Sequence, residues 1–269
     1  MARSGDAPAA MLAHAVRMTT ASESIRDYTL VEPRMIALYE AALDDVEIGS
    51  GTRLLDVGCG PGLFLRLAAQ RGAIVAGIDA TAPFVDLARE RLPAADVAMG
   101  EMECLPFPDG AFDVVTAFNA FQLAADPGNA LREAARVSRP GAPIVVATWG
   151  RPEQCEVAAY VKALAPLLPP PPAGAVGPFA LSESGALEEF AARGGLTAGE
   201  RREVLCVWSF PDELTLLRAL KSIRFAVKAI DSAGEDAVTA AVREAVAPYG
   251  MSDGGYRLEN VFIYLIAKT

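Results

Sequence analysis

The stretch Leu54-Leu55-Asp56-Val57-Gly58-Cys59-Gly60-Pro61-Gly62 decides the fold. Its first half is mostly apolar, as in a buried strand, and its second half places glycines at alternate positions. Glycine lacks a Cβ, so it adopts positive φ angles and lets a ligand approach the backbone closely. The apolar run from Leu63 begins a helix whose first N–H groups face the turn and suit a carboxylate or phosphate. We therefore predict a strand, a turn and a helix around a site for a nucleotide-like ligand.

The spacing of the glycines excludes two common nucleotide-binding motifs. The dinucleotide fingerprint G-x-G-x-x-G needs a third glycine where this chain has Leu63. A P-loop needs Gly-Lys followed by Ser or Thr, and the chain contains no Gly-Lys pair. The pattern that remains is Asp-x-Gly-x-Gly-x-Gly over residues 56–62.

Composition favours a globular protein. The chain has 269 residues, of which 52% are hydrophobic and 22% are charged, and its net charge is −10. This charge disfavours non-specific binding to nucleic acid or to anionic membranes. No apolar run reaches the roughly 20 residues of a membrane span, and residues 1–20 do not resemble a signal peptide. We therefore expect a cytoplasmic protein.

The histidines and cysteines of the chain limit which catalytic and metal sites it can form. The only histidine is His14, in an N-terminal region that we expect to be loosely structured, which disfavours Ser-His-Asp chemistry and histidine-rich metal sites. The cysteines at 59, 104, 155 and 206 form no Cys-x-x-Cys pair, so we expect buried, reduced thiols and no metal site.

Strands and helices alternate through the first part of the chain. After a helix over 33–45, we predict strands over 52–57, 73–78, 96–99, 112–118 and 144–149, and helices over 62–71, 84–92 and 127–137. Thr81 would cap the helix 84–92. This alternation predicts a doubly wound, mostly parallel sheet with helices on both faces.

The second part of the chain is richer in helices. We predict helices over 157–168, 182–194 (capped by Ser182), 211–230 and 236–247, and strands over 203–210 and 256–268. We interpret residues 33–269 as one domain in which 151–250 contain an α-helical, substrate-binding lid, while residues 1–32 help to cover the active site. Lys221, Arg224 and Lys228 would share one face of the 211–230 helix, either as a solvated face or as a patch for an anionic substrate group.

Asp79 is the second key residue. It ends the second strand, about 20 residues beyond the glycines, where a carboxylate can accept hydrogen bonds from both hydroxyls of a ribose. The alternative interpretation is an aspartate that caps a helix or stabilises a loop.

The pattern Asp56–Gly62 resembles motif I of the class I S-adenosylmethionine-dependent methyltransferases. The segment from Gly100 to Asp113, with Leu105-Pro106-Phe107-Pro108-Asp109, is similar to a segment of the small-molecule methyltransferases of ubiquinone and menaquinone biosynthesis (methyltransferase type 11). This resemblance covers about residues 50–150. It implies a seven-stranded Rossmann-like sheet of order 3-2-1-4-5-7-6 with the last strand antiparallel.

The resemblance also implies a set of residues that bind S-adenosyl-L-methionine. Glu101, which replaces the usual aspartate, would contact the adenine amino group and Met102 would pack on the ring, whereas residues 105–112 would be structural. Asp56 would orient the glycine turn through hydrogen bonds and help to hold the amino group of the cofactor. The full expected set is Tyr28, Asp56, Gly58, Cys59, Gly60, Gly62, Asp79, Ala80, Glu101, Met102, Phe118, Asn119 and Gln122.

The expected function is methyl transfer to an oxygen, nitrogen or carbon atom of a small, partly apolar metabolite, for example in natural-product or quinone biosynthesis. The rival interpretations are a methyltransferase fold that binds the cofactor for a non-methylating reaction and a regulatory or scaffold module. A general base is not identified: either the acceptor is self-sufficient, such as an enolisable carbon, a phenolate or a neutral amine, or a carboxylate or tyrosine from the lid or N-terminal segment, such as Tyr28, takes its proton. The oligomeric state is open, with a homodimer as one option.

Overall fold

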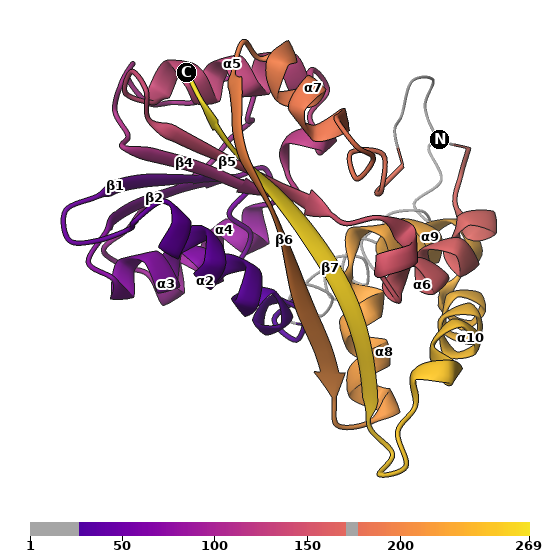
Figure 1. The fold of residues 1–269 in the computed structure, drawn as a ribbon. Coiled ribbons are helices and arrows are strands. Elements are labelled where there is room, and N and C mark those ends of the chain that lie inside the picture. Colours follow the sequence, from indigo (N-terminus) through magenta and orange to yellow (C-terminus); the bar gives the residue numbers. More distant parts are fainter. Residues whose placement is uncertain (1–26, 171–176) are drawn as a thin grey trace, which may run out of the picture. The chain divides into compact units, whose positions relative to one another are not determined.

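The computed structural model describes residues 27–170 and 177–269. The chain divides into two compact units (Figure 1). The larger, called the sheet unit, comprises Pro33–Ala159, Pro170–Ser209 and Arg257–Thr269. The smaller, called the helical unit, comprises, among the described residues, 27–32, Tyr160–Pro169 and Phe210–Tyr256.

A seven-stranded sheet with the order β3-β2-β1-β4-β5-β7-β6 confirms the predicted fold class. Strands β1 to β5 pair in parallel along the sheet, and β7 is antiparallel to β5. Since parallel strands end at the same edge, the carboxyl ends of β1 to β4 lie together. The strands are Arg53–Val57 (β1), Ile74–Asp79 (β2), Asp96–Met99 (β3), Val114–Phe118 (β4), Pro143–Trp149 (β5), Thr197–Phe210 (β6) and Tyr256–Lys268 (β7).

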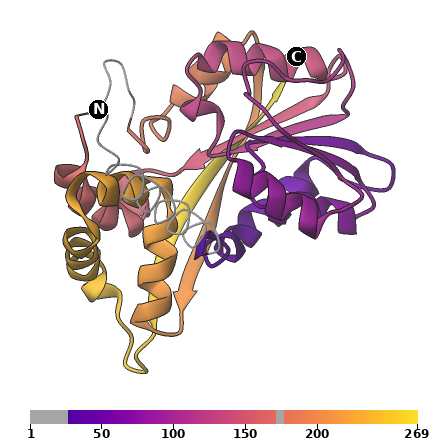
Figure 2. The ribbon, with the colours of Figure 1, turned by 180° about the vertical axis from the view of Figure 1, so that it is seen from behind.

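Helices cover both faces of the sheet, and one hydrophobic cluster lies on each face (Figures 1 and 2). Helices α5 and α7 pack on one face through residues such as Leu131 and Phe190. Helices α2, α3 and α4 pack on the other through residues such as Leu43, Phe64 and Val85. Their bounds are Ile36–Asp45 (α2), Leu63–Gln70 (α3), Ala82–Arg91 (α4), Pro127–Val137 (α5) and Ala186–Arg193 (α7), with short 3-10 helices at Glu32–Met35 (η1), Phe121–Leu123 (η2) and Pro152–Gln154 (η3).

The start of α7 differs from the prediction. Ser182 does not cap the helix: its hydroxyl donates to the carbonyl oxygen of Phe179 at 2.7 Å, and the N-cap residue is Gly185 with φ 81°. The predicted strand over 203–210 was also too short, because β6 already begins at Thr197. The polar residues at its start hid the strand, since they are exposed on both faces.

The helical unit contains three consecutive helices, α8 (Glu213–Ser222), α9 (Arg224–Ala233) and α10 (Glu235–Val246). Helix α6 (Val157–Leu164) crosses from the sheet unit into this unit, which also holds the 3-10 helices η4 (Ala165–Leu167) and η5 (Ala247–Tyr249). Leu216, Leu220, Ala229 and Val242 are fully buried in it. The buried hydroxyl of Tyr160 donates to the carbonyl oxygen of Leu220 at 3.0 Å. No helix in the described parts of the chain is long and apolar enough to cross a membrane.

The predicted single helix over 211–230 is wrong, because Ile223 has an extended backbone (ψ 134°) and separates α8 from α9. Lys221 therefore lies on α8, where it forms an ion pair with Glu235 at 2.6 Å. Arg224 and Lys228 lie on α9. The three basic residues thus do not share one helix face, and the predicted stripe does not exist as such.

Candidate functional site

The turn between β1 and α3 uses glycine for its backbone. Gly58, Gly60 and Gly62 have φ angles of 76°, 53° and 85°, which residues with a Cβ rarely adopt. The N–H groups of Gly58 and Cys59 both donate to the carbonyl oxygen of Ile78, at 2.8 and 3.0 Å. The positive φ angles confirm the turn that the glycine spacing predicts, and the two hydrogen bonds fasten this turn to the end of β2.

The three glycines meet different surroundings. A Cβ at Gly58 would lie 2.5 Å from the Cβ of Ala120, and one at Gly62 would lie 3.1 Å from the Cβ of Ala88. A Cβ at Gly60 would meet no atom within 4 Å. Gly58 and Gly62 therefore allow close packing of the chain, whereas Gly60 borders open space.

Asp79 connects the glycine turn to the start of α4. Its Oδ2 accepts a hydrogen bond from the N–H of Gly60 at 2.9 Å, and its Oδ1 accepts one from the N–H of Thr81 at 2.8 Å. Because each carboxylate oxygen can accept more than one hydrogen bond, acceptor capacity remains for the hydroxyls of a ligand. Both interpretations of Asp79, structural and ligand-binding, are compatible with this geometry. The exposed Ala80 follows it directly.

Asp56 does not bond to the glycine turn, which corrects the sequence-based expectation. It is buried on β1, and its Oδ1 accepts a hydrogen bond from Oγ1 of Thr116, its register partner on β4, at 2.7 Å. Burial raises the pKa of Asp56 to about 8, with a smaller contribution from the charge of Asp79 and an opposing one from the Thr116 bond. The signal for this pair was present in the sequence, because Thr116 is the polar residue inside an otherwise apolar strand.

Glu101 and Met102 follow β3 at the same edge of the sheet. The preceding residue, Gly100, donates its N–H to the carbonyl oxygen of Asp79 at 3.1 Å, which places this segment beside the end of β2. Glu101 is exposed, and Met102 is partly buried against the core. The structure thus brings the predicted adenine-contacting pair next to the predicted ribose-binding residue.

Two predicted residues point their side chains into the core. Cys59 is buried, and the ring of Phe118 packs against Tyr39 and Phe64 with centroid distances of 4.8 and 4.5 Å. A contact of Cys59 or Phe118 with a ligand would therefore use their backbone. Cys104 is exposed, so the expectation that every cysteine is buried is wrong for this residue.

Asn119 and Gln122, after β4, carry acceptors without partners. The side-chain oxygens Oδ1 of Asn119 and Oε1 of Gln122 are buried and have no hydrogen-bond partner among the described residues. Asn119 also has a positive φ of 54°, an unusual conformation for a residue other than glycine. Buried, unpaired acceptors are costly unless a ligand pairs them. The amide nitrogen Nε2 of Gln122 donates a long hydrogen bond of 3.5 Å to Oγ1 of Thr148.

An aromatic cluster at the end of β5 was missed by the sequence analysis. Trp149, the last residue of β5, packs on Phe262 and Trp208 with centroid distances of 4.3 and 5.7 Å, and on Phe179 at 6.1 Å. These residues lie far apart in the chain, so no local pattern could join them. Of the other expected residues, Tyr28 belongs to the helical unit and its role stays a prediction, while His14 lies outside the described residues.

A hollow of about 240 Å³ opens at the opposite edge of the sheet, where β1, β2 and β3 begin. Arg53, Asp96 and Phe107 are among the residues that line it. It is separate from the glycine turn, so it plays no part in the candidate site. In residues 27–170 and 177–269, no three His, Cys, Asp or Glu side chains gather as a metal site.

Comparison with known proteins shows which family one segment of the chain matches. Residues 55–146 match the family model described as "Methyltransferase domain". Malonyl-[acyl-carrier protein] O-methyltransferase of Serratia marcescens is 39% identical over 98 residues, covering 36% of this chain and 38% of that protein. Demethylmenaquinone methyltransferase of Renibacterium salmoninarum is 34% identical over 110 residues, covering 41% of this chain and 46% of that protein. The chain thus spans less than half the length of either relative.

A solved structure has the same fold. It is described as the [4+2]-cyclase SpnF, has a TM-score of 0.57 and 22% identity, and the match covers 86% of this chain and 80% of the other. At this identity the likeness concerns the fold alone. The family assignment comes from the matched segment, which includes the glycine turn, Asp79 and Glu101. Residues 55–146 of this chain therefore belong to the methyltransferase domain family.

Proposed function

We propose that the protein binds S-adenosyl-L-methionine and transfers its methyl group to an oxygen, nitrogen or carbon atom of a small, partly apolar metabolite. The observation that carries this proposal is the hydrogen bond from Gly60 N–H to Asp79 Oδ2 inside the matched methyltransferase domain. It joins the turn that borders open space to the carboxylate at the end of β2. The cofactor, when bound, supplies an already activated methyl group on a sulfonium, so the protein mainly aligns the reactants and excludes water.

The described residues offer suitable partners for each part of the cofactor. Asp79 would accept hydrogen bonds from the ribose hydroxyls, and Glu101 would accept one from the adenine amino group while Met102 packs on the ring. The unpaired oxygens of Asn119 and Gln122 would accept hydrogen bonds from the ammonium group of the methionine part. The space beside Gly60 would admit the cofactor next to the turn.

The acceptor would provide its own nucleophile. Gln122 carries a neutral amide that cannot take a proton near neutral pH. The chain has one histidine, His14, and no described residue is assigned as a base. We therefore favour an acceptor that needs no base from the protein, such as an enolisable carbon, a phenolate or a neutral amine, in a cytoplasmic enzyme. A tyrosine such as Tyr28 as base is the alternative.

A second candidate function is a non-methylating reaction on the same scaffold. It is motivated by the fold shared with a protein described as a [4+2]-cyclase. The two sequence relatives named above, both described as methyltransferases, favour methyl transfer. The two functions differ in one product, because only methyl transfer converts the cofactor to S-adenosyl-L-homocysteine.

Calorimetry and product analysis test the proposal. Titration with S-adenosyl-L-homocysteine should show one site per chain. Incubation with S-adenosyl-L-methionine and a panel of phenols, quinols, β-keto esters and amines should release S-adenosyl-L-homocysteine with at least one class of acceptor. Absence of binding would overturn the proposal. Binding without product across the whole panel would favour the non-methylating function.

A further inference from the structure

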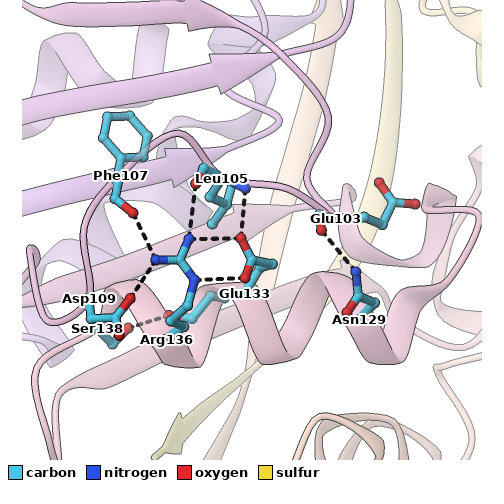
Figure 3. Close-up of polar contacts among 9 residues, drawn as sticks. Glu103, Leu105, Phe107, Asp109, Asn129, Glu133, Arg136 and Ser138 are labelled. Carbon is cyan, nitrogen blue, oxygen red and sulfur yellow. Dashed lines mark hydrogen bonds and ion pairs between the residues drawn. The ribbon is translucent and has the colours of Figure 1, made fainter.

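The segment between β3 and β4, residues 100–113, carries Glu101 and Met102 and has no regular secondary structure over most of its length. Its backbone nevertheless has a defined course, because side chains of α5 bind its peptide groups (Figure 3). The family resemblance implies a structural role for residues 105–112 but not the contacts that hold them. The α5 contacts give that role a physical basis.

The first contact joins Asn129 and Glu103. The Nδ2 of Asn129 donates to the backbone carbonyl oxygen of Glu103 at 2.8 Å (Figure 3). In return, Oε1 of Glu103 accepts hydrogen bonds from the N–H groups of Ala125 and Asp126 at 2.7 and 3.3 Å. The segment and the start of α5 are therefore tied in both directions.

The second contact is made by an ion pair on α5. Glu133 and Arg136 are joined by two hydrogen bonds of 2.7 and 2.8 Å. Oε2 of Glu133 accepts from the N–H of Leu105 at 2.8 Å, and Arg136 donates to the carbonyl oxygens of Leu105 at 2.9 Å and Phe107 at 2.8 Å (Figure 3). Arg136 also donates to Oδ1 of Asp109 at 2.7 Å. One planar guanidinium thus binds several groups along the segment at once.

These contacts follow a regular geometry. Asn129, Glu133 and Arg136 are spaced by four and three residues, which places them on one face of α5. Their backbone partners are residues 103, 105 and 107, at alternate positions of the segment. At the other end of the segment, the N–H of Gly100 donates to the backbone carbonyl oxygen of Asp79 at 3.1 Å. Glu101 and Met102 therefore lie between two fixed points of the backbone.

We propose that Glu133 and Arg136 are positioning residues that set the recognition of the adenine base, because they hold the segment that carries Glu101. This inference rests on the proposed function, in which Glu101 accepts a hydrogen bond from the adenine amino group. A carboxylate held in place favours the 6-amino group of adenine and disfavours the 6-oxo group of hypoxanthine. A segment released from α5 would discriminate less between the two bases.

The test compares the affinities of S-adenosyl-L-homocysteine and S-inosyl-L-homocysteine by calorimetry. In Arg136→Lys, a compact ammonium cannot bridge Leu105, Phe107 and Glu133, so the ratio of the two affinities should fall about fivefold or more. Glu133→Gln keeps an acceptor for Leu105 but loses the ion pair, and it should give a smaller fall. Arg132→Lys is the matched control, since Arg132 is on the same helix and pairs with Asp126 at 3.7 Å.

The outcomes separate a positioning role from general loosening. A variant that merely weakens the fold would lose affinity for both ligands equally and keep their ratio. The inference is therefore overturned if Arg136→Lys and Glu133→Gln both keep the wild-type ratio, or if Arg132→Lys lowers it as much. If the wild-type protein binds neither ligand, the proposed function fails and this inference fails with it. If the wild-type protein binds S-adenosyl-L-homocysteine and the variants keep its affinity ratio, the inference alone fails.

Discussion

At the scale of single residues, Gly58 and Gly60 share positive φ angles but differ in what surrounds them. We expect Gly60→Ala to lose about 1–2 kcal/mol of stability through backbone strain. Gly58→Ala should lose more, because its Cβ would also lie 2.5 Å from that of Ala120. Only Gly60→Ala should lose cofactor affinity out of proportion to stability. Urea unfolding and calorimetry measure both quantities, and equal stability of the two variants would contradict this assignment.

Asp79 supports both the turn and the proposed ribose contact. Asp79→Ala should weaken binding of S-adenosyl-L-homocysteine by about 1.5–3 kcal/mol, because it removes charge-assisted hydrogen bonds. Asp86, exposed on α4, provides the control Asp86→Ala, which should leave the affinity unchanged. Unchanged affinity in a folded Asp79→Ala variant would remove this residue from the site.

Asp56 makes stability depend on pH. Its pKa is about 8 in the folded protein and near 3.8 when the group is in water, so the folded state holds the proton more tightly. This contribution to stability is complete below about pH 4 and is lost as the pH rises toward 8 and above. The free energy of unfolding should therefore fall as the pH rises, and Asp56→Asn should remove that part of its slope with pH. The amide oxygen that this substitution introduces can still accept a hydrogen bond from Thr116. Urea unfolding at about pH 5 and about pH 7.5 measures the slope, and equal slopes in both proteins would disprove the assignment.

The sequence predicted where the residues of the candidate site lie in the fold better than it predicted their contacts. Glycine spacing and the end of β2 pointed to Gly60 and Asp79, because a tight turn imposes strict local requirements. The partners of Asp56 and Glu133 were not predicted, since they come from elements that meet only in the folded sheet. Side-chain direction depends on that packing, and a linear pattern does not contain it.

At the scale of elements, helix caps differ in what their side chains do. Asp126 accepts a hydrogen bond from the N–H of Asn129 at 3.0 Å at the start of α5. Thr81 occupies the N-cap position of α4, but its side chain makes no cap hydrogen bond. Asp126→Ala should therefore cost about 0.5–2 kcal/mol of stability, whereas Thr81→Ala should cost less. Urea unfolding compares the two variants, and a larger loss for Thr81→Ala would contradict the cap assignment.

Helix periodicity predicted where helices lie but not where one ends. The bounds of α5 and β7 agree with the prediction, because Pro127 marks the helix start and a long apolar pattern marks the strand. The break at Ile223 was missed, since the apolar spacing continues from Leu220 through Val227. One residue with an extended backbone interrupts a helix without disturbing this pattern.

At the scale of the whole molecule, the sheet order was predictable and the division into two units was not. Alternating strands and helices with right-handed connections leave few possible topologies, and the family resemblance selected one of them. No comparable rule of connection predicts the helical unit, because it joins Tyr160–Pro169 and Phe210–Tyr256 from distant parts of the chain. Helices α8, α9 and α10 use their apolar residues for packing within the unit, so their sequence pattern alone does not reveal a ligand.

We propose that residues 151–250 contain the lid that selects the acceptor. The support is that this part lies outside the matched methyltransferase domain and carries apolar helices. Hydrogen exchange in residues 211–250 should slow when S-adenosyl-L-homocysteine and an acceptor found in the panel are both present. S-adenosyl-L-homocysteine alone is the control. The same exchange in all states would count against a lid.

The ends of the α8–α10 region are neighbours. β6 and β7 lie side by side, and a Cβ on Gly255 would be 3.0 Å from the carbonyl oxygen of Phe210. The intervening helices are therefore an insertion in a strand-to-strand connection, and the entropy of closing such a loop changes slowly with its length. Recombination could exchange this insertion as a cassette while the strands that flank it keep their pairing. Under the proposed lid role of this region, such an exchange would change the acceptor in one genetic step and leave the candidate cofactor site unaltered.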